Sequence, residues 1–168
     1  MRENCPVLKR SDLFRPGELF FIHNSKDLPE YVSKMHCHDF VEISYVLSGE
    51  CERIEGSTVY HSKKGDLYIT NYMVPHSEQI IGTEPFITYD CAFSPEFIDI
   101  TLTGINDFSN VKSSFLLNTL YPSETCFKPF VNLNNDVCDE IELLLKKMLN
   151  EYSCRQKGYI EILGGAKI

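Results

Sequence analysis

The sequence lacks a long hydrophobic run, which excludes a membrane-spanning helix. Its longest uninterrupted apolar stretch is residues 19–22, whereas a helix needs about 20 apolar residues to cross a bilayer. The N-terminus carries positive charge without an apolar segment behind it, so it does not match a secretory signal. We therefore expect a cytoplasmic protein without a membrane partner.

Clustered positive charge is also missing. The chain has 16 Lys and Arg against 24 Asp and Glu, which gives a net charge of −8. Its basic runs, such as residues 63–64 and 146–147, are no longer than two residues. A surface that binds duplex DNA needs clustered cations to displace counterions from the phosphates. The chain by itself is therefore predicted not to bind DNA.

Paired cysteine motifs are absent as well. The 7 cysteines form an odd set without a CxxC pair, whereas disulfide scaffolds and zinc knuckles need regular, even spacing. Reduced thiols that behave as small buried hydrophobic residues fit this pattern better. This agrees with a cytoplasmic location.

Short β-type runs, separated by turn residues, fill the chain up to about residue 95. The clearest is residues 41–48, where the odd-numbered positions are apolar and the even-numbered positions include Glu42 and Ser44. This alternation is typical of a strand with one buried face. Several such strands in succession predict an all-β sandwich or barrel. A partly polar inner face would create a ligand cavity in a small barrel.

The pattern changes to a helical period after residue 95. Apolar residues recur at helical spacing over 135–152, where Asn134 or Asn135 can act as the N-cap. A second helix is expected from about Tyr159. Residues 100–131 have too weak a pattern to assign.

The helix over 135–152 is also the predicted homodimer contact. An apolar stripe that the barrel does not fully cover would be hidden by two-fold pairing with a second copy. Packing of the same stripe on the barrel of its own subunit is the alternative. The residues assigned to the dimer contact are Ile141, Leu145, Met148 and Tyr152.

Three histidines and one glutamate form a candidate metal site. His36 and His38 are two positions apart, so they share a face if they lie on a strand. Glu42 has the same parity but would lie roughly 13 Å beyond His38 on a straight strand, so a bend near Asp39 is required. His76 begins another predicted strand. This donor set suits zinc, nickel, iron or manganese; the alternative is a hydrogen-bonded polar cluster without a metal.

The spacing of these residues resembles the two motifs of the cupin superfamily. Glu30 stands where the first motif has its first glycine, and Asn71 and Met73 replace the proline and second glycine of the second motif. The first motif is therefore the more specific match. The matching residues are His36, His38, Glu42, Gly49, Gly65 and His76.

Within the cupins, the runs HCHDFVEISYVLSGE and KKGDLYITNYMVPHS, followed by a helical tail, resemble the N-terminal domain of AraC-type transcription regulators. The resemblance covers nearly the whole chain. It implies an N-terminal arm (1–14), a jelly-roll double-stranded β-helix barrel (15–95) that senses a small molecule, and a helical segment (96–168) that dimerises. It also implies a basic helix-turn-helix domain that binds DNA. That domain is absent from this chain, which we therefore expect to be a fragment.

The resemblance favours a ligand-sensing and dimerisation domain of a transcription regulator rather than an enzyme. The polar pocket is compatible with a sugar, and equally with a small acid bound through a metal. The rival is a metal-dependent cupin enzyme, such as a dioxygenase or a sugar isomerase, because four protein ligands leave coordination positions open for substrate or O₂. The residues expected to contact the effector are His36, His38, Glu42, Ser44 and His76.

Overall fold

The structure is a computed structural model that describes residues 5–27, 34–94, 96–97, 130–155 and 157–159. The runs predicted to be strands are strands, and the long helix is a helix. In chain order the elements are β1 (Val7–Leu8), α1 (Arg10–Leu13), β2 (Phe20–Asn24), the 3₁₀ turn η1 (Ser25–Asp27), β3 (Cys37–His38), β4 (Val41–Ser48), β5 (Glu50–Glu55), β6 (Thr58–Lys63), β7 (Asp66–Thr70), β8 (His76–Ile81), β9 (Ile87–Phe93), β10 (Phe130–Asn132) and α4 (Asn135–Cys154).

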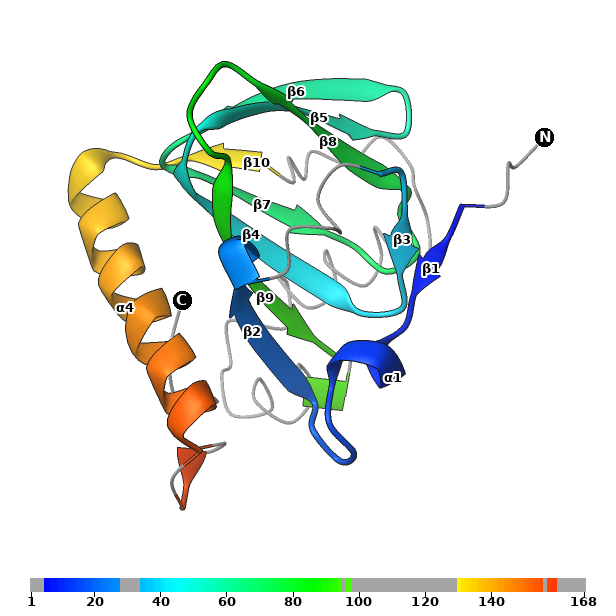
Figure 1. Cartoon of the computed structure of the whole chain (residues 1–168), viewed down its shortest axis with the longest axis vertical. Helices are drawn as coiled ribbons and strands as arrows, with labels where there is room; N and C mark the ends of the chain where they lie inside the picture. Colours follow the sequence, from blue (N-terminus) through cyan, green and yellow to red (C-terminus); the bar gives the residue numbers. More distant parts are fainter. Residues whose placement is uncertain (1–4, 28–33, 95, 98–129, 156, 160–168) are drawn as a thin grey trace, which may run out of the picture.

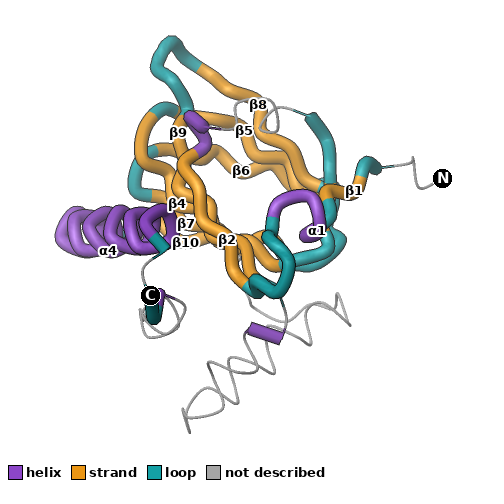
Figure 2. Tube along the Cα trace, turned by 60° about the horizontal axis from the view of Figure 1, so that its bottom comes forward, coloured by secondary structure: helices purple, strands orange, loops and turns teal. Residues whose placement is uncertain are grey.

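Two antiparallel sheets face each other and enclose the interior of the barrel (Figure 1). The larger sheet has the strand order β10-β7-β4-β9-β2, and the smaller has the order β6-β5-β8. A short parallel pair, β1 and β3, lies at one end. Figure 2 shows the sheets curving toward each other, with α4 outside them. The predicted class, a mainly β barrel followed by a helix, is confirmed.

The chain passes from the larger sheet to the smaller one at Gly49, between β4 and β5. Gly49 has a φ of +77°, in the region where residues with a Cβ are strained. A Cβ at this position would lie 2.6 Å from the carbonyl oxygen of Pro85. Only glycine satisfies both the turn and this close approach of the backbone.

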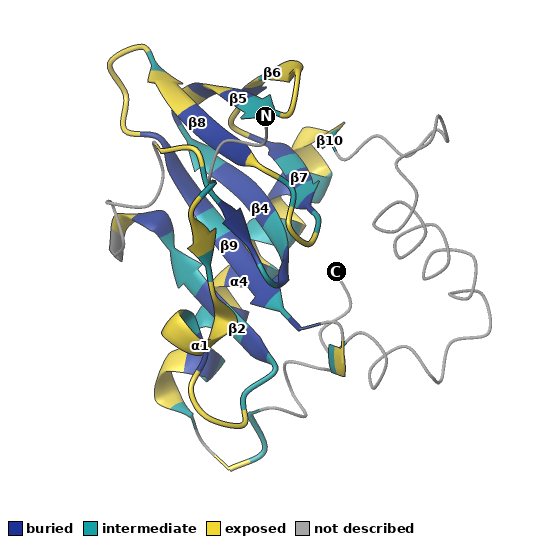
Figure 3. Cartoon of the chain, turned by 90° about the vertical axis from the view of Figure 1, so that its right-hand side faces the viewer, coloured by how far each residue is buried: buried dark blue, intermediate teal, exposed yellow. Residues whose placement is uncertain are grey.

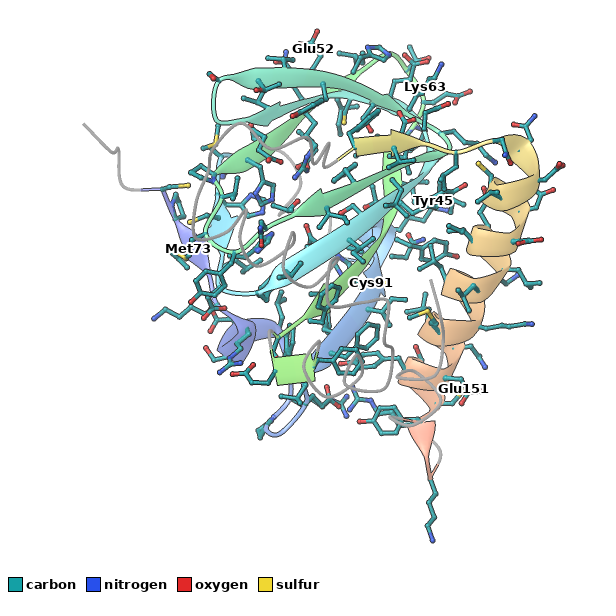
Figure 4. The ribbon with its side chains drawn as sticks, turned by 180° about the vertical axis from the view of Figure 1, so that it is seen from behind. Tyr45, Glu52, Lys63, Met73, Cys91 and Glu151 are labelled. Carbon is teal, nitrogen blue, oxygen red and sulfur yellow. The ribbon has the colours of Figure 1, made fainter. Side chains whose placement is uncertain are left out.

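Strand β4 has the two faces that its alternation predicts. Ile43, Tyr45 and Leu47 belong to the apolar cluster between the larger sheet and α4, whereas Glu42 and Ser44 line a cavity inside the barrel. Figure 4 shows Tyr45 at the side of the sheet that faces α4, where its hydroxyl donates to Glu142 at 2.9 Å. One strand therefore contacts both the interior of the barrel and the helix outside.

Helix α4 begins at Asn135 because the Asn134 side chain accepts a hydrogen bond from the Val137 amide at 3.0 Å. This settles which of the two asparagines is the cap. Cys138 also lies on its buried side. In the described part of the chain, no helix combines the length and apolar character that crossing a membrane requires.

The apolar stripe of α4 packs on its own barrel. Leu145, Met148 and Tyr152 are buried in the cluster with β2, β4 and β9, and Ile141 is half-buried against it. Within the chain, the alternative of packing on its own barrel is therefore what the structure has, because the outer face of the larger sheet is itself apolar and the stripe covers it. A dimer contact through this helix stays a prediction. The large apolar side chain that α4 exposes, within the described residues, is Leu143.

The cysteines of the described chain are free thiols, as the sequence predicts. Cys37, Cys51, Cys91 and Cys138 are buried. Cys126, Glu30, the helix expected beyond residue 159 and most of the unassigned segment 100–131 lie outside the described residues.

Candidate functional site

Three of the four predicted metal ligands converge inside the barrel. His38 ends β3, Glu42 lies in β4 and His76 begins β8, and one donor atom from each lies within 4.8 Å of the other two. The His38 Nε2 and Glu42 Oε2 atoms are 3.7 Å apart. The bend that the sequence requires is present, since residues 39 and 40 separate β3 from β4 and Asp39 accepts a hydrogen bond from the Arg10 amide at 2.6 Å.

The histidine rings at the site are held in one tautomer. In each, Nδ1 contacts a main-chain carbonyl oxygen, which can only accept, so Nδ1 carries a proton and, in the neutral ring, Nε2 presents a lone pair. Metal-binding histidines are commonly oriented by such a bond. The contacts are from His36 to Lys34 (2.8 Å), from His38 to Phe40 (2.7 Å) and from His76 to Val74 (2.9 Å).

The electrostatics of the group favour a bound cation. Burial alone would raise the pKa of Glu42, but the His38 ring and the nearby His76 ring lower it by more. The pKa of Glu42 therefore lies below its usual value, and the carboxyl stays ionised. Burial and the nearby Arg53 guanidinium lower the pKa of His76 to about 3, so its ring is neutral near pH 7. His38 is fully buried and its Nε2 has no hydrogen-bond partner. Two imidazoles and a carboxylate could hold a divalent metal.

His36 lies beside this group without belonging to it. Its ring centroid is 4.3 Å from that of His76 and 6.4 Å from that of His38. Its main chain bridges that of His76, with hydrogen bonds of 3.0 and 2.9 Å in the two directions. His36 still lines the barrel cavity, as do Glu42, Ser44 and His76.

The interior also contains an ion pair that the sequence reasoning missed. Arg53 on β5 is 1% exposed, forms an ion pair with Glu78 and a hydrogen bond with Thr70, and lies 4.0 Å from the centre of the Tyr68 ring. Burial raises the pKa of Glu78 to about 7, although Arg53 opposes the shift. The available signal was strand parity. Arg53 is two positions from Cys51 and Glu78 is two positions from His76, so each shares a strand face with a residue that is buried.

A cavity of about 50 Å³ lies between the two sheets. An apolar cavity of about 150 Å³ is enough for benzene, so the space suits only a compact group. Asp90 and His23 also line the cavity, although the sequence did not predict them as site residues. Figure 3 shows the buried surfaces of β4, β8 and β9 around this region. The ionisable groups of the wall include Glu42, Glu78, Asp90, His23, His36 and His76.

The sequence profile of the AraC-like ligand binding domain matches residues 18–157 of the chain. The chain belongs to this family. The AraC-like fold is also found among solved structures: apo ToxT K231A of Vibrio cholerae has a TM-score of 0.52 at 8% identity, and the match covers 88% of this chain and 52% of that one. This likeness concerns the fold alone. The chain thus spans about half the length of the ToxT chain that it matches.

Two further matches have lower TM-scores. ToxT of V. cholerae bound to (E)-4-(8-methylnaphthalen-1-yl)but-3-enoic acid has a TM-score of 0.48 at 13% identity, covering 88% of this chain and 53% of that one. The cupin domain of Schizosaccharomyces pombe Cnp3 has a TM-score of 0.41 at 19% identity, covering 58% and 72%. No curated protein gives a significant match.

Proposed function

We propose that this AraC-like domain is the ligand-sensing and dimerisation part of a cytoplasmic transcription regulator, whose DNA-binding part is a separate domain. The observation that carries the proposal is the cavity between the sheets, which has ionisable and hydroxyl side chains on its wall in a member of a ligand-binding family. Burying such groups is costly unless they are paired, so their presence favours a role in binding.

The proposed signal passes from the cavity to α4 through single strands. On β4, Ser44 lines the cavity and the next residue, Tyr45, packs toward α4. On β9, Asp90 lines the cavity in the same way, and the next residue, Cys91, belongs to the apolar cluster that packs on α4. A ligand that shifts β4 or β9 would therefore change the packing of α4, provided that it binds the two arrangements with different affinity.

The N-terminal arm offers a second route for the signal. Leu8 and Leu13 contribute to the wall of the cavity, and both pack on a small cluster of Phe14, Phe40 and Ala92. The arm therefore closes part of the space that a ligand would fill. A larger ligand would have to displace it, because a sugar ring is larger than benzene and does not fit a cavity of about 50 Å³.

A homodimer remains part of the proposal. Leu145, Met148 and Tyr152 are committed to the barrel, so a contact that leaves the fold intact would use the outer face of α4, where Leu143 is 54% exposed. Light scattering on the purified chain and on Leu143→Glu tests this contact. A dimer that the substitution splits supports it, and a monomer at tens of micromolar contradicts it.

We also propose that His38, Glu42 and His76 hold a divalent metal of the zinc, nickel, iron or manganese type. Elemental analysis of the purified chain tests this against His38→Gln, with His61→Gln as the matched control because His61 is exposed on β6. Loss of metal in His38→Gln alone supports the site. Equal metal content in both variants would remove it.

A metal-dependent cupin enzyme is the second candidate function. It is favoured by the same three residues, because a site with three protein ligands leaves coordination positions open for a substrate. A regulator and an enzyme differ in the fate of the bound molecule. The regulator retains its ligand unchanged, whereas the enzyme releases a product that mass spectrometry of the reaction mixture detects.

The sensing role is tested by a thermal-shift screen of small amines, sugars and carboxylic acids. Any compound that stabilises the chain is then tested on Ser44→Leu, which fills the cavity, and by hydrogen exchange in α4. The proposal expects stabilisation that Ser44→Leu abolishes and altered exchange in α4. Stabilisation that survives Ser44→Leu, or a ligand that leaves α4 unchanged, would contradict it.

A further inference from the structure

A row of polar side chains crosses three adjacent strands at the wall of the cavity. Asp90 on β9 is paired in register with Ser44 on β4 and with His23 on β2, so the three side chains share one face of the sheet. The Asp90 carboxylate accepts a hydrogen bond from the Thr88 hydroxyl at 2.7 Å. One of its oxygens lies 3.4 Å from His23 Nε2.

Glu42 extends this row diagonally. Its partner in the register is Ala92, two residues from Asp90 on the same strand. Diagonal neighbours on one face of a sheet have Cα atoms about 7–8 Å apart. Two carboxylates at that spacing can both accept hydrogen bonds from one small donor placed between them.

The buried arginine of the interior is paired with other carboxylates. Arg53 is committed to Glu78 and lies 3.6 Å from Glu55. Within the described residues, the wall of the cavity contains neither lysine nor arginine. His23 can share the charge of Asp90 only when its ring is protonated. Within the described residues, Asp90 and Glu42 have hydroxyl and imidazole neighbours but no lysine or arginine as an ion-pair partner, so the pair is a candidate site for a cation from outside the chain.

A second observation points to the same end of the cavity. His38 is 0% exposed, and its Nε2, which is 3.7 Å from the Glu42 carboxylate, has no hydrogen-bond partner. Nδ1 contacts the carbonyl of Phe40, so in the neutral ring Nε2 is the acceptor. His23 Nδ1 is also buried without a partner. Unpartnered buried polar atoms in a native fold call for an explanation, such as a bound water, ion or ligand.

We propose that the cavity binds a small ligand through a positively charged amino group seated between Glu42 and Asp90. This deepens the proposed sensing function and rests on it. The amino group and the proposed metal share Glu42, so they are alternative occupants of that carboxylate. An ammonium group has three donors and no acceptor, which matches a wall of carboxylate oxygens and imidazole lone pairs. Asp90 and His23 lie outside the group of residues close enough to share a metal ion, so the larger ammonium suits them better.

The geometry disfavours the opposite charge. A carboxylate in this space would face Glu42 and Asp90, and would find no free cation among the described residues of the wall. The volume of about 50 Å³ limits what enters to an amino group and a few carbons. Any longer part of the ligand must extend out of the cavity.

The test uses probes of matched size and different charge. Ethylammonium, ethanol, acetate and potassium ion are titrated into the metal-free chain at constant ionic strength, and binding is followed by nuclear magnetic resonance. Ligands of three heavy atoms bind with a Kd of roughly 1 mM at best, which this method measures. We expect saturable binding of ethylammonium alone.

Two variants and one control locate the binding. Asp90→Asn and Glu42→Gln should weaken ethylammonium binding about tenfold or more, since hydrogen bonds to charged groups are the stronger ones. Glu52→Gln should leave it unchanged, because Glu52 is exposed and points away from the barrel (Figure 4). Asp90→Asn without ligand should unfold at the same temperature as wild type or higher.

The remaining outcomes overturn the inference. Equal binding of potassium would show a general cation site, and binding of acetate or ethanol would show that charge does not select the ligand. A lower unfolding temperature of Asp90→Asn would show that the carboxylate is structural. If ethylammonium does not bind while the thermal-shift screen finds a ligand that Ser44→Leu abolishes, the inference fails and the sensing function stands.

Discussion

Replacing Leu145 by alanine should destabilise the chain much more than replacing Leu143, two residues away on α4. Leu145 is 2% exposed and Leu143 is 54% exposed. Truncation of a buried leucine removes its transfer free energy and leaves a cavity, so we expect a loss of about 3 kcal/mol in the free energy of unfolding. Leu143→Ala should change it by less than about 0.5 kcal/mol. Leucine and alanine have similar helix propensities, so the difference reports burial.

Urea unfolding followed by circular dichroism measures both variants. The measurement is repeated at two protein concentrations, because a contact between subunits makes apparent stability depend on concentration and a contact within one chain does not. We expect the effect of Leu145→Ala to be independent of concentration. Equal effects of the two substitutions, or an effect of Leu145→Ala that disappears on dilution, would refute the packing of the stripe on its own barrel.

Three further outcomes are expected. Burial alone would raise the pKa of Glu18, but the Tyr152 and Tyr159 hydroxyls and Arg155 lower it by more, so it lies below its usual value. The resulting stability is present above the unfolded pKa of the carboxyl and is lost as pH falls through the folded one. Glu18→Gln should therefore be less stable than wild type in urea at pH 7, by a difference that shrinks as the solution is acidified; a difference that does not shrink in acid would contradict the contact. Gly49→Ala should lower the stability more than Gly82→Ala does. The Cβ added at Gly82 meets open space, so this substitution costs only the strain of a positive φ, about 1–2 kcal/mol. Equal shifts of the unfolding temperature would contradict the close approach at Gly49. With its charge of −8, the chain alone should give no salt-sensitive shift of promoter DNA in a mobility assay, and a sequence-dependent complex would overturn the separate DNA-binding domain.

The fold could be predicted from the sequence where local pattern and tertiary packing agree. The alternation over 41–48 identifies β4 and separates its two faces, because one face of this strand meets an apolar helix. The N-cap of α4 could be narrowed only to Asn134 or Asn135, since either asparagine can supply the capping oxygen. The covering of the α4 stripe by the larger sheet could not be predicted, because a helical period reveals an apolar face but not whether its partner is in the same chain.

The site could be predicted as far as strand parity extends. His38, Glu42 and His76 follow from their spacing and from the expected bend at Asp39. His36 has the same parity but lies beside the group, since it precedes β3 and pairs with the main chain of His76.

The charged residues of the interior were missed for a different reason. Arg53, Glu78 and Asp90 each lie on a strand, where a charged side chain usually faces solvent. Only closure of the two sheets turns their face inward. Parity places Arg53 and Glu78 on the same faces as Cys51 and His76, but that these faces are buried depends on the partner sheet.

The most direct test of the account is native mass spectrometry of the purified chain, with His38→Gln and Ser44→Leu measured in parallel. It reports bound metal, bound small molecule and subunit number in one spectrum. We predict a wild-type chain that carries a low-mass ligand in its barrel, which Ser44→Leu loses, and a metal that His38→Gln loses. A wild-type chain with the bare polypeptide mass, also after incubation with the compounds found in the thermal-shift screen, would contradict the claim that the interior of the barrel is a binding site.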